Sequence, residues 1–425
     1  MKKPWSDFGV AVNAYVEGYG CSLNQGDTEK IRFLLTENGF TLSNPEKADI
    51  IIVNTCAVKT VTENKILRSI KALNSQRKQN SKLIVTGCLP VVSKEKIFSV
   101  CADTVLFGTE LEELSSFLGL SFPKNKLALG NLKTNPNISI IPVSHGCLSG
   151  CAYCCVKQAR GNLRSYNIKE INNAFKNALK SSNEIWLTAN DLGCYGFDIG
   201  TNLAELLFEL LKNKGRYRIR LGMMNPTHLK KYLPGLLKAM EDERVYKFLH
   251  VPIQSGSDKI LKLMQRNNSV KEFSALVKTL REKFPAMTIS TDIIAGFPGE
   301  TESDFRESVA LIEALDFDLV NVSRFALRPN TKAASMPNPV PTEQLRIRTR
   351  VLAEKALKSV LARNKGLEGS TQKVLVSEKG SKGGFVCITN NYKPVVVEKG
   401  KIGDFIAVKI EKAFRGHLEG KLLSN

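Results

Sequence analysis

Three cysteines stand close together in the segment Cys147-Leu-Ser-Gly-Cys151-Ala-Tyr-Cys154, here called the central triad. Cysteine thiolates hold the irons of iron–sulfur clusters, and three of them within this short segment can wrap one face of a [4Fe–4S] cube. With no fourth cysteine at a suitable spacing, one iron would remain open to a small molecule. The alternative is a structural zinc site completed by Cys155 or His145. Zinc sites more often pair two CxxC motifs or add two histidines, which disfavours this alternative.

Three further cysteines, Cys21, Cys56 and Cys88, form what we call the N-terminal triad. Each directly follows a predicted strand, in EGYG-Cys21, IVNT-Cys56 and IVTG-Cys88. Because the carboxyl ends of parallel strands lie at one edge of a sheet, we expect these thiols to meet there. Three ligands would again leave an iron with an open site. The alternative is three unconnected buried thiols, since single cysteines are often buried.

The elements that must position the N-terminal triad alternate between strand and helix. Strands are expected at 11–20, 48–55 and 81–87, and the apolar run ADIIIVNT is typical of a strand buried on both faces. One helix is expected from Asp27 to Asn38, and another from a capping box at Thr60 and Glu63 to about Arg77. This alternation predicts an α/β domain with a doubly wound parallel sheet.

The central triad follows the first of a second series of strands. Six strands are expected, at 138–145, 184–190, 217–224, 246–253, 287–297 and 319–327. Six successive βα units predict a partial (β/α)6 barrel with ligands at the C-terminal ends of its strands. Short strands separated by glycine turns after residue 367, at 373–379, 384–390, 393–399 and 404–414, predict a small all-β barrel. The predicted domains are 1–125, a linker at 126–138, the barrel at 139–340, a basic helix at 341–366 and the β-barrel at 367–425.

Charge and composition narrow the class of partner. Lys and Arg number 61 against 41 Asp and Glu, giving a net charge of +20. Such an excess favours a polyanion, although a basic surface without a specific partner is the alternative. No apolar stretch reaches the roughly 18 residues of a membrane span, and no export signal precedes the ten cysteines. We therefore expect a soluble cytoplasmic protein that uses cysteine for metal binding or catalysis.

The motif CxxxCxxC with Tyr153 before its third cysteine resembles that of the radical S-adenosylmethionine (SAM) superfamily. The resemblance implies that the open iron binds SAM and that electron transfer releases a 5′-deoxyadenosyl radical. GYGCSLNQGDTE, VNTCAVKTVTENK and VTGCLP resemble, in order, the N-terminal motifs of the methylthiotransferases. That family joins a three-cysteine cluster domain to a radical SAM barrel and an RNA-binding TRAM barrel. The resemblance thus implies two [4Fe–4S] clusters, one on each triad.

Within that family, five stretches resemble the archaeal and eukaryotic tRNA N6-threonylcarbamoyladenosine branch. They are ARGNLRSY (159–166), EIWLTANDLGCYGFDIGTNL (184–203), RLGMMNP (220–226), FLHVPIQSGSD (248–258) and STDIIAGFPGET (290–301). The resemblance implies methylthiolation of C2 of that nucleoside, at position 37 of tRNA. It implies tRNA and an electron donor protein as partners, and no membrane. Both triads should then face one cleft that admits a nucleoside.

Further residues are predicted to contact SAM because they lie beside the cluster motif or at barrel strand ends. They are Tyr153, Asp191, Gln254, Arg266, Asp292 and Gly296. Any of the last five could instead stabilise a loop. Arg160 and Arg164 could face the SAM carboxylate or a tRNA phosphate, or form exposed salt bridges. Arg328-Pro329-Asn330-Thr331 resembles the family's RPGT motif, and its asparagine also tolerates a left-handed backbone.

Two kinds of alternative function remain at this point. The same architecture in bacteria modifies isopentenyl-adenosine in tRNA or an aspartate of a ribosomal protein. A basic protein substrate would prefer an acidic C-terminal module, whereas residues 365–425 carry 11 Lys and Arg against 6 Asp and Glu. The other alternative is an RNA-binding iron–sulfur redox sensor, which has no need for six barrel strands and a SAM-type cluster.

Overall fold

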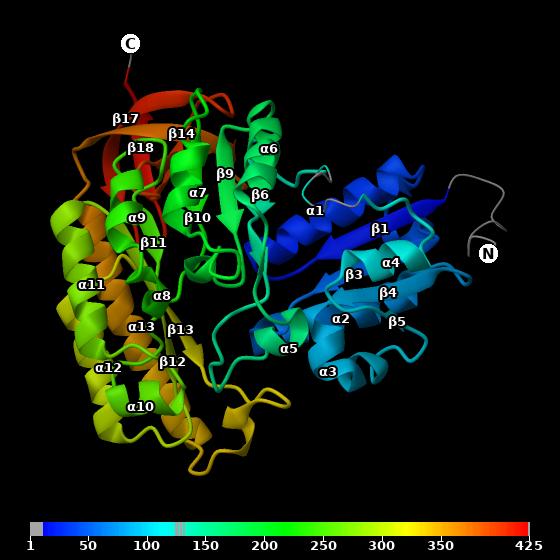
Figure 1. The fold of residues 1–425 in the computed structure, drawn as a ribbon, viewed down its shortest axis with the longest axis horizontal. Helices are drawn as coiled ribbons and strands as arrows, with labels where there is room; N and C mark the ends of the chain where they lie inside the picture. Colours follow the sequence, from blue (N-terminus) through cyan, green and yellow to red (C-terminus); the bar gives the residue numbers. More distant parts are fainter. Residues whose placement is uncertain (1–11, 124–126, 128–129, 131, 424–425) are drawn as a thin grey trace. The chain divides into compact units, whose positions relative to one another are not determined.

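The computed structural model describes residues 12–123, 127, 130 and 132–423, which form two compact units (Figure 1). The first unit combines the described residues up to 134 with 140–164 and 326–334. The second combines 135–139 and 165–325 with the described residues from 335 onward. Both cysteine triads therefore belong to the first unit. Part of the predicted linker 126–138 and the start of the predicted N-terminal domain lie outside the described residues.

The first unit is built on a parallel sheet in the order β2-β1-β3-β4-β5. Its strands are β1 Asn13–Gly18, β2 Thr41–Leu42, β3 Ile50–Thr55, β4 Lys82–Gly87 and β5 Val105–Leu106. The three predicted strands are present, and β3 is buried along its whole length, as its apolar run indicates. The sheet is parallel because each strand returns through a helix to the same edge.

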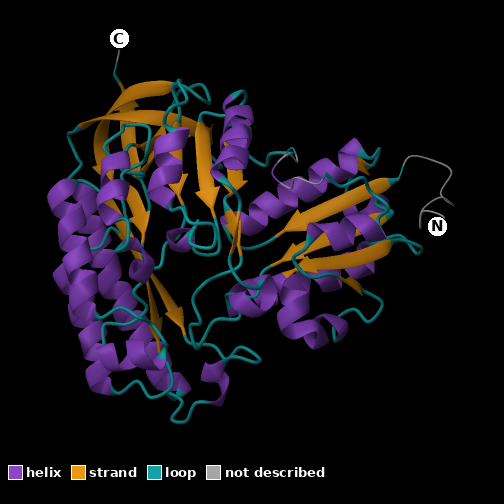
Figure 2. Cartoon of the chain, viewed as in Figure 1, coloured by secondary structure: helices purple, strands orange, loops and turns teal. Residues whose placement is uncertain are grey.

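Helices cover both faces of this sheet (Figure 2). They are α1 Ser22–Glu37, α2 Thr60–Gln76, α3 Cys88–Phe98 and α4 Leu111–Phe117; α5 Val156–Arg160 follows the central triad. Ile51 and Val53 of β3 pack in a core with α2 and α3, whereas Ile50 and Ile52 pack in a second core with α1 and α4. Alternate side chains of one strand thus fill two layers, which confirms the doubly wound fold.

Two sequence predictions about these helices are wrong. Helix α1 begins at Ser22 and not at Asp27, because Gly26 does not break it. A side chain there would come 3.1 Å from Ile140, so the glycine serves close packing. Helix α2 does begin at Thr60, but its N-cap is Lys59, with no side-chain cap. The expected capping box is absent because the Glu63 carboxylate is taken by Arg328 and Lys96.

All six predicted barrel strands are present. Five of them lie in the second unit, and the remaining strand, β6, begins in the second unit and continues into the first. The six strands form two three-stranded sheets, β10-β9-β6 and β11-β12-β13, linked by a parallel bridge from Ile219 to Val245. The strands are β6 Ile138–Pro142, β9 Glu184–Thr188, β10 Arg218–Leu221, β11 Phe248–His250, β12 Thr288–Ala295 and β13 Leu319–Arg324. The short β7 Ser144–His145 and β8 Arg164–Ser165 form a separate pair. The strand prediction is confirmed.

Helices follow these strands, as the βα pattern requires. They are α6 Ile168–Leu179, α7 Leu203–Leu210, α8 Pro226–Leu229, α9 Leu233–Ala239, α10 Asp258–Leu263, α11 Val270–Lys283 and α12 Glu302–Leu315. Helices α6, α11 and α12 begin with complete capping boxes, at Asn167, Ser269 and Thr301. Helix α13 Thr342–Lys365 begins directly after Pro341, where the sequence places the basic helix. Among the described residues, no helix combines the length and the apolar character that crossing a membrane requires.

The C-terminal part of the second unit is a closed barrel in the order β14-β15-β16-β18-β17. Its strands are β14 Thr371–Lys379, β15 Phe385–Thr389, β16 Pro394–Val397, β17 Phe405–Ala413 and β18 Leu418–Leu422. Strand β18 was not predicted, because Gly420 and alternating charges weaken its strand pattern. Gly420 instead lets β18 approach β17: a side chain there would lie 2.9 Å from the Lys409 carbonyl oxygen. The predicted all-β barrel is confirmed.

Candidate functional site

The N-terminal triad lies at the carboxyl edge of the first unit's sheet. Cys21 is the N-cap of α1, Cys56 follows β3, and Cys88 is the first residue of α3. Gly20, with φ +113°, packs against Cys56, because a side chain there would come 2.5 Å from the Cys56 Cβ. The loops of Cys21 and Cys56 are therefore in contact.

Buried asparagines lock these loops together. Asn24 donates from Nδ2 to the carbonyl oxygens of Tyr19 (2.6 Å) and Thr55 (2.9 Å). Asn54 donates in turn to the Asn24 carbonyl oxygen (2.9 Å). At Gly87 (φ +97°), a side chain would lie 2.4 Å from the Thr55 carbonyl oxygen, so the turn before Cys88 also packs on this loop. These contacts fix the three strand ends relative to one another.

The central triad lies in the loop between β7 and α5 of the same unit. The Cys147 N–H donates to the Gly161 carbonyl oxygen (3.2 Å), and the Cys154 N–H to that of Cys151 (3.1 Å). Gly146 (φ +71°) leaves no room for a side chain, which would come 1.9 Å from the Asn162 carbonyl oxygen. The loop thus closes on the residues after α5, and it keeps its three cysteines partly exposed.

The electrostatics of both triads suit a metal more than isolated thiols. Burial, together with the neighbouring cysteines, raises the pKa of Cys56 and of Cys154 to about 12. Backbone N–H groups of Val58 and Val156 oppose this rise, the former 3.5 Å from the Cys56 sulfur. Without a metal, these thiols stay protonated near neutral pH. A bound metal cation replaces their protons and stabilises the thiolates, which gives a reason for several cysteines to lie close together.

Arg160, the last residue of α5, reaches the N-terminal triad. Its Nη2 donates to Asn24 Oδ1 (2.6 Å), and its Nη1 lies 2.8 Å from Asp27 Oδ2. Burial raises the pKa of the Cys88 thiol, and the charge and hydrogen bond of Arg160 oppose that rise. Only 4% of Arg160 is exposed, so the exposed salt bridge considered for it is wrong. Arg164 does form such a pair, with Glu110.

The loop after Cys56 is also held by the Arg328 motif. Arg328 donates from Nη2 to the Val58 carbonyl oxygen (3.0 Å) and Thr60 Oγ1 (3.2 Å), and it pairs with buried Glu63. Asn330 has φ +58°, which confirms that asparagine supports the left-handed turn expected there. A residue 272 positions after Cys56 thus braces its loop.

The predicted SAM contacts other than Tyr153 belong to the second unit, at barrel strand ends. Asp191 follows β9; its Oδ1 accepts from the backbone N–H groups of Gly193 and Asn225 (both 2.9 Å), and its Oδ2 lies 3.6 Å from His228 Nε2. Burial raises the pKa of Asp191 and lowers that of His228. Asp292, on β12, accepts from Asn321 (2.8 Å) and lies 2.9 Å from His250 Nε2.

The other three have clear structural contacts. Gln254 (φ +83°) bridges to Ile293 after β11, and buried Arg266 donates to the Pro252 carbonyl oxygen. Gly296 (φ +78°) packs against Leu345, which a side chain would meet at 2.4 Å. These contacts shape the strand ends, and the predicted roles toward SAM stay predictions.

Two features of this site were not predicted from the sequence. No role was predicted for His228 or His250, yet each pairs with a predicted carboxylate. The contact of Arg160 with the N-terminal triad, 72 residues away from Cys88 in the chain, was also not predicted. The sequence did offer one signal for these histidines. His250 ends β11 and His228 follows β10, so both lie beside strand ends that were expected to contact a ligand.

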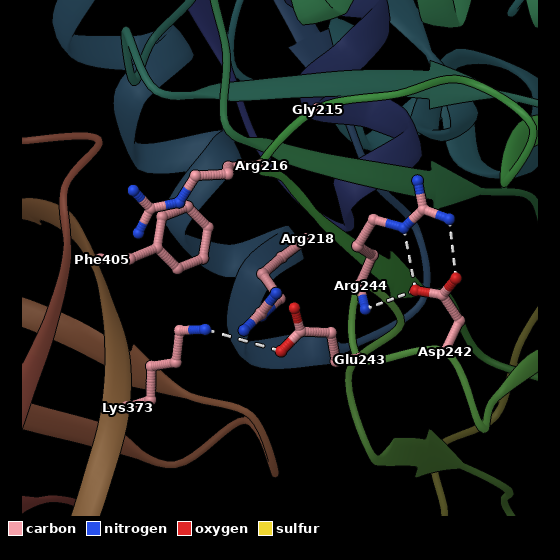
Figure 3. A pocket seen from close by; sticks show the side chains of 8 residues that line it. All are labelled: Gly215, Arg216, Arg218, Asp242, Glu243, Arg244, Lys373 and Phe405. Atoms are coloured by element: carbon pink, nitrogen blue, oxygen red, sulfur yellow. Dashed lines mark hydrogen bonds and ion pairs between the residues drawn. The ribbon is translucent and has the colours of Figure 1, made fainter.

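A separate hollow of about 340 Å³ lies in the second unit, between the start of β10 and the C-terminal barrel (Figure 3). It is lined by Gly215, Arg216, Arg218, Asp242, Glu243, Arg244, Lys373 and Phe405. Arg216 and Arg218 lie over the Phe405 ring, at 5.1 and 4.9 Å from its centroid. Arg244 pairs with Asp242 (2.7 Å) and Lys373 with Glu243 (3.6 Å). Four basic side chains against two acidic ones make this a candidate contact for phosphates.

Comparison with known families agrees with this architecture. Residues 13–108 match the Uncharacterized protein family UPF0004, 141–312 the Radical SAM superfamily and 365–423 the TRAM domain. The radical SAM methyltransferase TsrM from Kitasatospora setae, solved with tryptophan and a SAM analog, shares the fold with TM-score 0.58 at 13% identity, over 76% of this chain and 75% of that chain. Fold and site define a radical SAM protein that carries a second cysteine triad and a TRAM barrel.

Relatives with assigned names identify the family. The chain is 40% identical to the probable threonylcarbamoyladenosine tRNA methylthiotransferase of Pyrococcus horikoshii, over 97% of this chain and all of that protein. It is 34% identical to the Homo sapiens threonylcarbamoyladenosine tRNA methylthiotransferase, over 97% of this chain and 74% of that protein. The chain belongs to the threonylcarbamoyladenosine tRNA methylthiotransferase family.

Proposed function

We propose that this protein attaches a methylthio group to C2 of N6-threonylcarbamoyladenosine at position 37 of tRNA. The observation that carries the proposal is the 40% identity, over the full length of the Pyrococcus horikoshii protein, to a relative of that name. The two cysteine triads of the first unit give the proposal its chemistry. The reaction takes place where tRNA is, which we propose to be the cytoplasm.

We propose that the N-terminal triad and the central triad each hold a [4Fe–4S] cluster. The donor sets fit: three thiols each, backbone N–H groups aimed at Cys56 and Cys154, and glycines before Cys21, Cys88 and Cys147. Arg160 adds a buried cation beside Cys88, and its Nε makes no hydrogen bond of good geometry to any described residue. When bound, the clusters and SAM supply the radical, the sulfur and the methyl group that an unreactive aromatic C–H requires.

The protein's own groups then bind, orient and exclude water. We propose that Tyr153, beside the third central cysteine, and the strand-end residues Asp191, Gln254, Arg266, Asp292 and Gly296 contact SAM. Asp191 is 2% exposed and already fixed by two backbone N–H groups, so its second oxygen has a set direction. Such fixed polar groups orient a ligand without reorganisation when it binds. A protein that donates single electrons is a further partner that the chemistry requires.

We propose that the basic C-terminal barrel and the hollow beside it bind the tRNA backbone. The barrel matches the TRAM domain, and residues 341–425 contain 17 Lys and Arg against 8 Asp and Glu. Lys373 and Phe405 bring the barrel's side chains to Arg216 and Arg218 of the hollow (Figure 3). Arginines stacked on an aromatic ring are well placed for phosphates and unstacked bases.

The decisive experiment is mass spectrometry of tRNA nucleosides from cells with and without the gene. We expect loss of the methylthio-threonylcarbamoyl nucleoside and accumulation of its unmodified precursor, restored by the wild-type gene but not by Cys151→Ala. An unchanged nucleoside profile would contradict the proposal. Loss of a methylthio-isopentenyl nucleoside would favour that substrate instead. Tight RNA binding without SAM cleavage by the anaerobic protein would favour the redox sensor.

A further inference from the structure

Helix α5 joins the two triads within five residues. It begins immediately after Cys154 and Cys155 and ends at Arg160. At its start, the buried Cys155 thiol donates to the Ala57 carbonyl oxygen (3.5 Å), directly beside Cys56. At its end, Arg160 contacts Asn24 and Asp27 of α1. One short helix therefore follows the central triad directly and contacts residues around the N-terminal triad from both of its ends.

Arg160 places a permanent charge in a buried setting. Arg160 and Asp27 are 4% and 5% exposed, and their ion pair measures 2.8 Å. Removing a cation and an anion from water costs more than their attraction returns unless further groups interact with them. Asn24 accepts a hydrogen bond from Nη2 of Arg160, whereas Nε of Arg160 makes no hydrogen bond of good geometry to any described residue. Ala159, the residue before Arg160, packs in one buried cluster with Cys88. Cys88 and Cys21, two of the three thiols of the N-terminal triad, interact with the Arg160 charge.

The charge balance of the pocket changes when iron binds. Without a cluster, the positive charge of Arg160 is balanced by the negative charge of Asp27, and the pair has no net charge. A cluster held by three thiolates is anionic, and reduction makes it more so. Hydrogen bonds and charges at the sulfurs of such a cluster set its reduction potential. The Arg160 guanidinium lies beside Cys88, so its charge would stabilise the anionic cluster, and its Nε–H could donate a hydrogen bond to it.

We propose that Arg160 is a positioning residue of the N-terminal cluster: through Cys88 it holds a fixed positive charge and a hydrogen bond on that cluster, which keep it assembled and raise its reduction potential. The inference rests on the proposed function, because it requires a cluster at the N-terminal triad. It goes further in assigning a role to a residue of the radical SAM loop in tuning the other cluster. Helix α5 thereby links the reduction potential of the N-terminal cluster to the structure around the central triad.

The test uses the full-length chain with Cys147→Ala, Cys151→Ala and Cys154→Ala, so that only the N-terminal triad can hold a cluster. Into this background go Arg160→Lys, Arg160→Gln and Arg160→Met. A fourth variant combines Arg160→Met with Asp27→Asn, so that no unpaired acid remains buried. After anaerobic reconstitution, iron and sulfide per chain, the electron paramagnetic resonance spectrum and a redox titration are measured.

We expect Arg160→Lys to keep most of the iron and a reduction potential close to that of the background chain. The neutral variants should have a lower reduction potential. In the iron-loaded Arg160→Gln chain, the ratio of reduced to oxidised cluster at a fixed applied potential should fall at least tenfold, about 59 mV for one electron. In the Arg160→Met/Asp27→Asn chain, which loses one charge of each sign, the ratio should fall in the same direction by a smaller factor, because Arg160 affects Cys88 more than Asp27 does. Arg164→Met, which breaks the exposed pair with Glu110, is the matched control and should change neither potential nor spectrum.

The outcomes separate this inference from the proposed function. If the neutral variants bind full iron at an unchanged potential with an unchanged spectrum, Arg160 has no such role, and the nucleoside result stands unaffected. If Arg160→Lys loses as much potential as Arg160→Met in folded, iron-loaded protein, charge is not the cause and the inference fails. If the background chain binds no iron, the N-terminal cluster assignment fails with it.

Discussion

Replacing Arg328 by Met should loosen the loop that carries Cys56. The guanidinium contacts the Val58 carbonyl oxygen, Thr60 Oγ1 and Glu63, and its side chain is 6% exposed against 2% for Glu63. Removing one partner of a buried ion pair costs about 3–5 kcal/mol. Because Lys96 still pairs with Glu63, we expect the lower end, about 3 kcal/mol.

Hydrogen–deuterium exchange gives the local readout for this change. A loss of about 3 kcal/mol in the opening free energy should speed exchange of the amides from 56 to 63 by roughly a hundredfold. The melting temperature of the first unit should fall by roughly 6–12 °C, at about 2–4 °C per kcal/mol for a unit of its size. Anaerobic reconstitution should then give less iron at the N-terminal triad.

The control for Arg328→Met is Arg164→Ala, which removes the exposed pair with Glu110 and should cost less than about 1 kcal/mol. Glu63→Gln and the double variant complete a mutant cycle, in which we expect a coupling energy of at least about 1 kcal/mol. The reasoning is wrong if Arg328→Met exchanges as slowly as the Arg164→Ala protein, or if the cycle gives no coupling.

Further predictions concern single positions. Gly20→Ala should reduce iron at the N-terminal triad by more than half, because the new Cβ would lie 2.5 Å from that of Cys56; Gly39→Ala, also at positive φ but with nothing within 4 Å, should leave iron content intact, and equal losses would exclude the packing argument. Cys151→Ala should abolish anaerobic SAM cleavage while the N-terminal triad keeps its iron, and retained cleavage would refute the role of the central triad. Arg216→Glu with Lys373→Glu should weaken tRNA binding at least tenfold and flatten its dependence on salt, whereas Lys278→Glu, on exposed α11, should not; equal effects would exclude the hollow as a contact. Asp318 contacts Lys393 (2.8 Å), Arg363 (2.7 Å) and Arg281 (2.6 Å), and although burial raises its pKa, these cations bring it below the usual value. Its contribution to stability is therefore present above about pH 4 and lost as pH falls through the lower folded value, so urea titrations should show a smaller acid loss for Asp318→Asn than for wild type, and equal losses would contradict this.

The regular elements could be predicted because their signals are local. Apolar runs such as Ile50–Thr55 mark buried strands wherever they occur, and Pro341 marks the start of α13 to the residue. The position of the N-terminal triad followed from topology alone, since parallel strands end at one edge. The order of three folds along the chain needed no more than these patterns.

The errors arose where a distant residue takes over a local role. Thr60 and Glu63 have the spacing of a capping box, but the partner of Glu63 is an arginine 265 residues away. The predicted start at Asp27 leaves out the first turn of α1, where Gly26 packs against Ile140, 114 residues further along the chain. Arg160 has the sequence surroundings of a surface residue, and only the fold places Asp27 and Asn24 around it. Local patterns cannot carry such information.

The bracing of the Cys56 loop by Arg328 also has a consequence for biosynthesis. At about 5–20 residues per second, a ribosome needs roughly 15–50 seconds to advance over the 272 residues between them. During that interval the emerging N-terminal sheet has its three cysteines but lacks the Arg328 contacts that hold the Cys56 loop. Delivery of iron and sulfide to this site should therefore succeed best on completed chains, which would shield a half-built and oxygen-sensitive centre from exposure during translation.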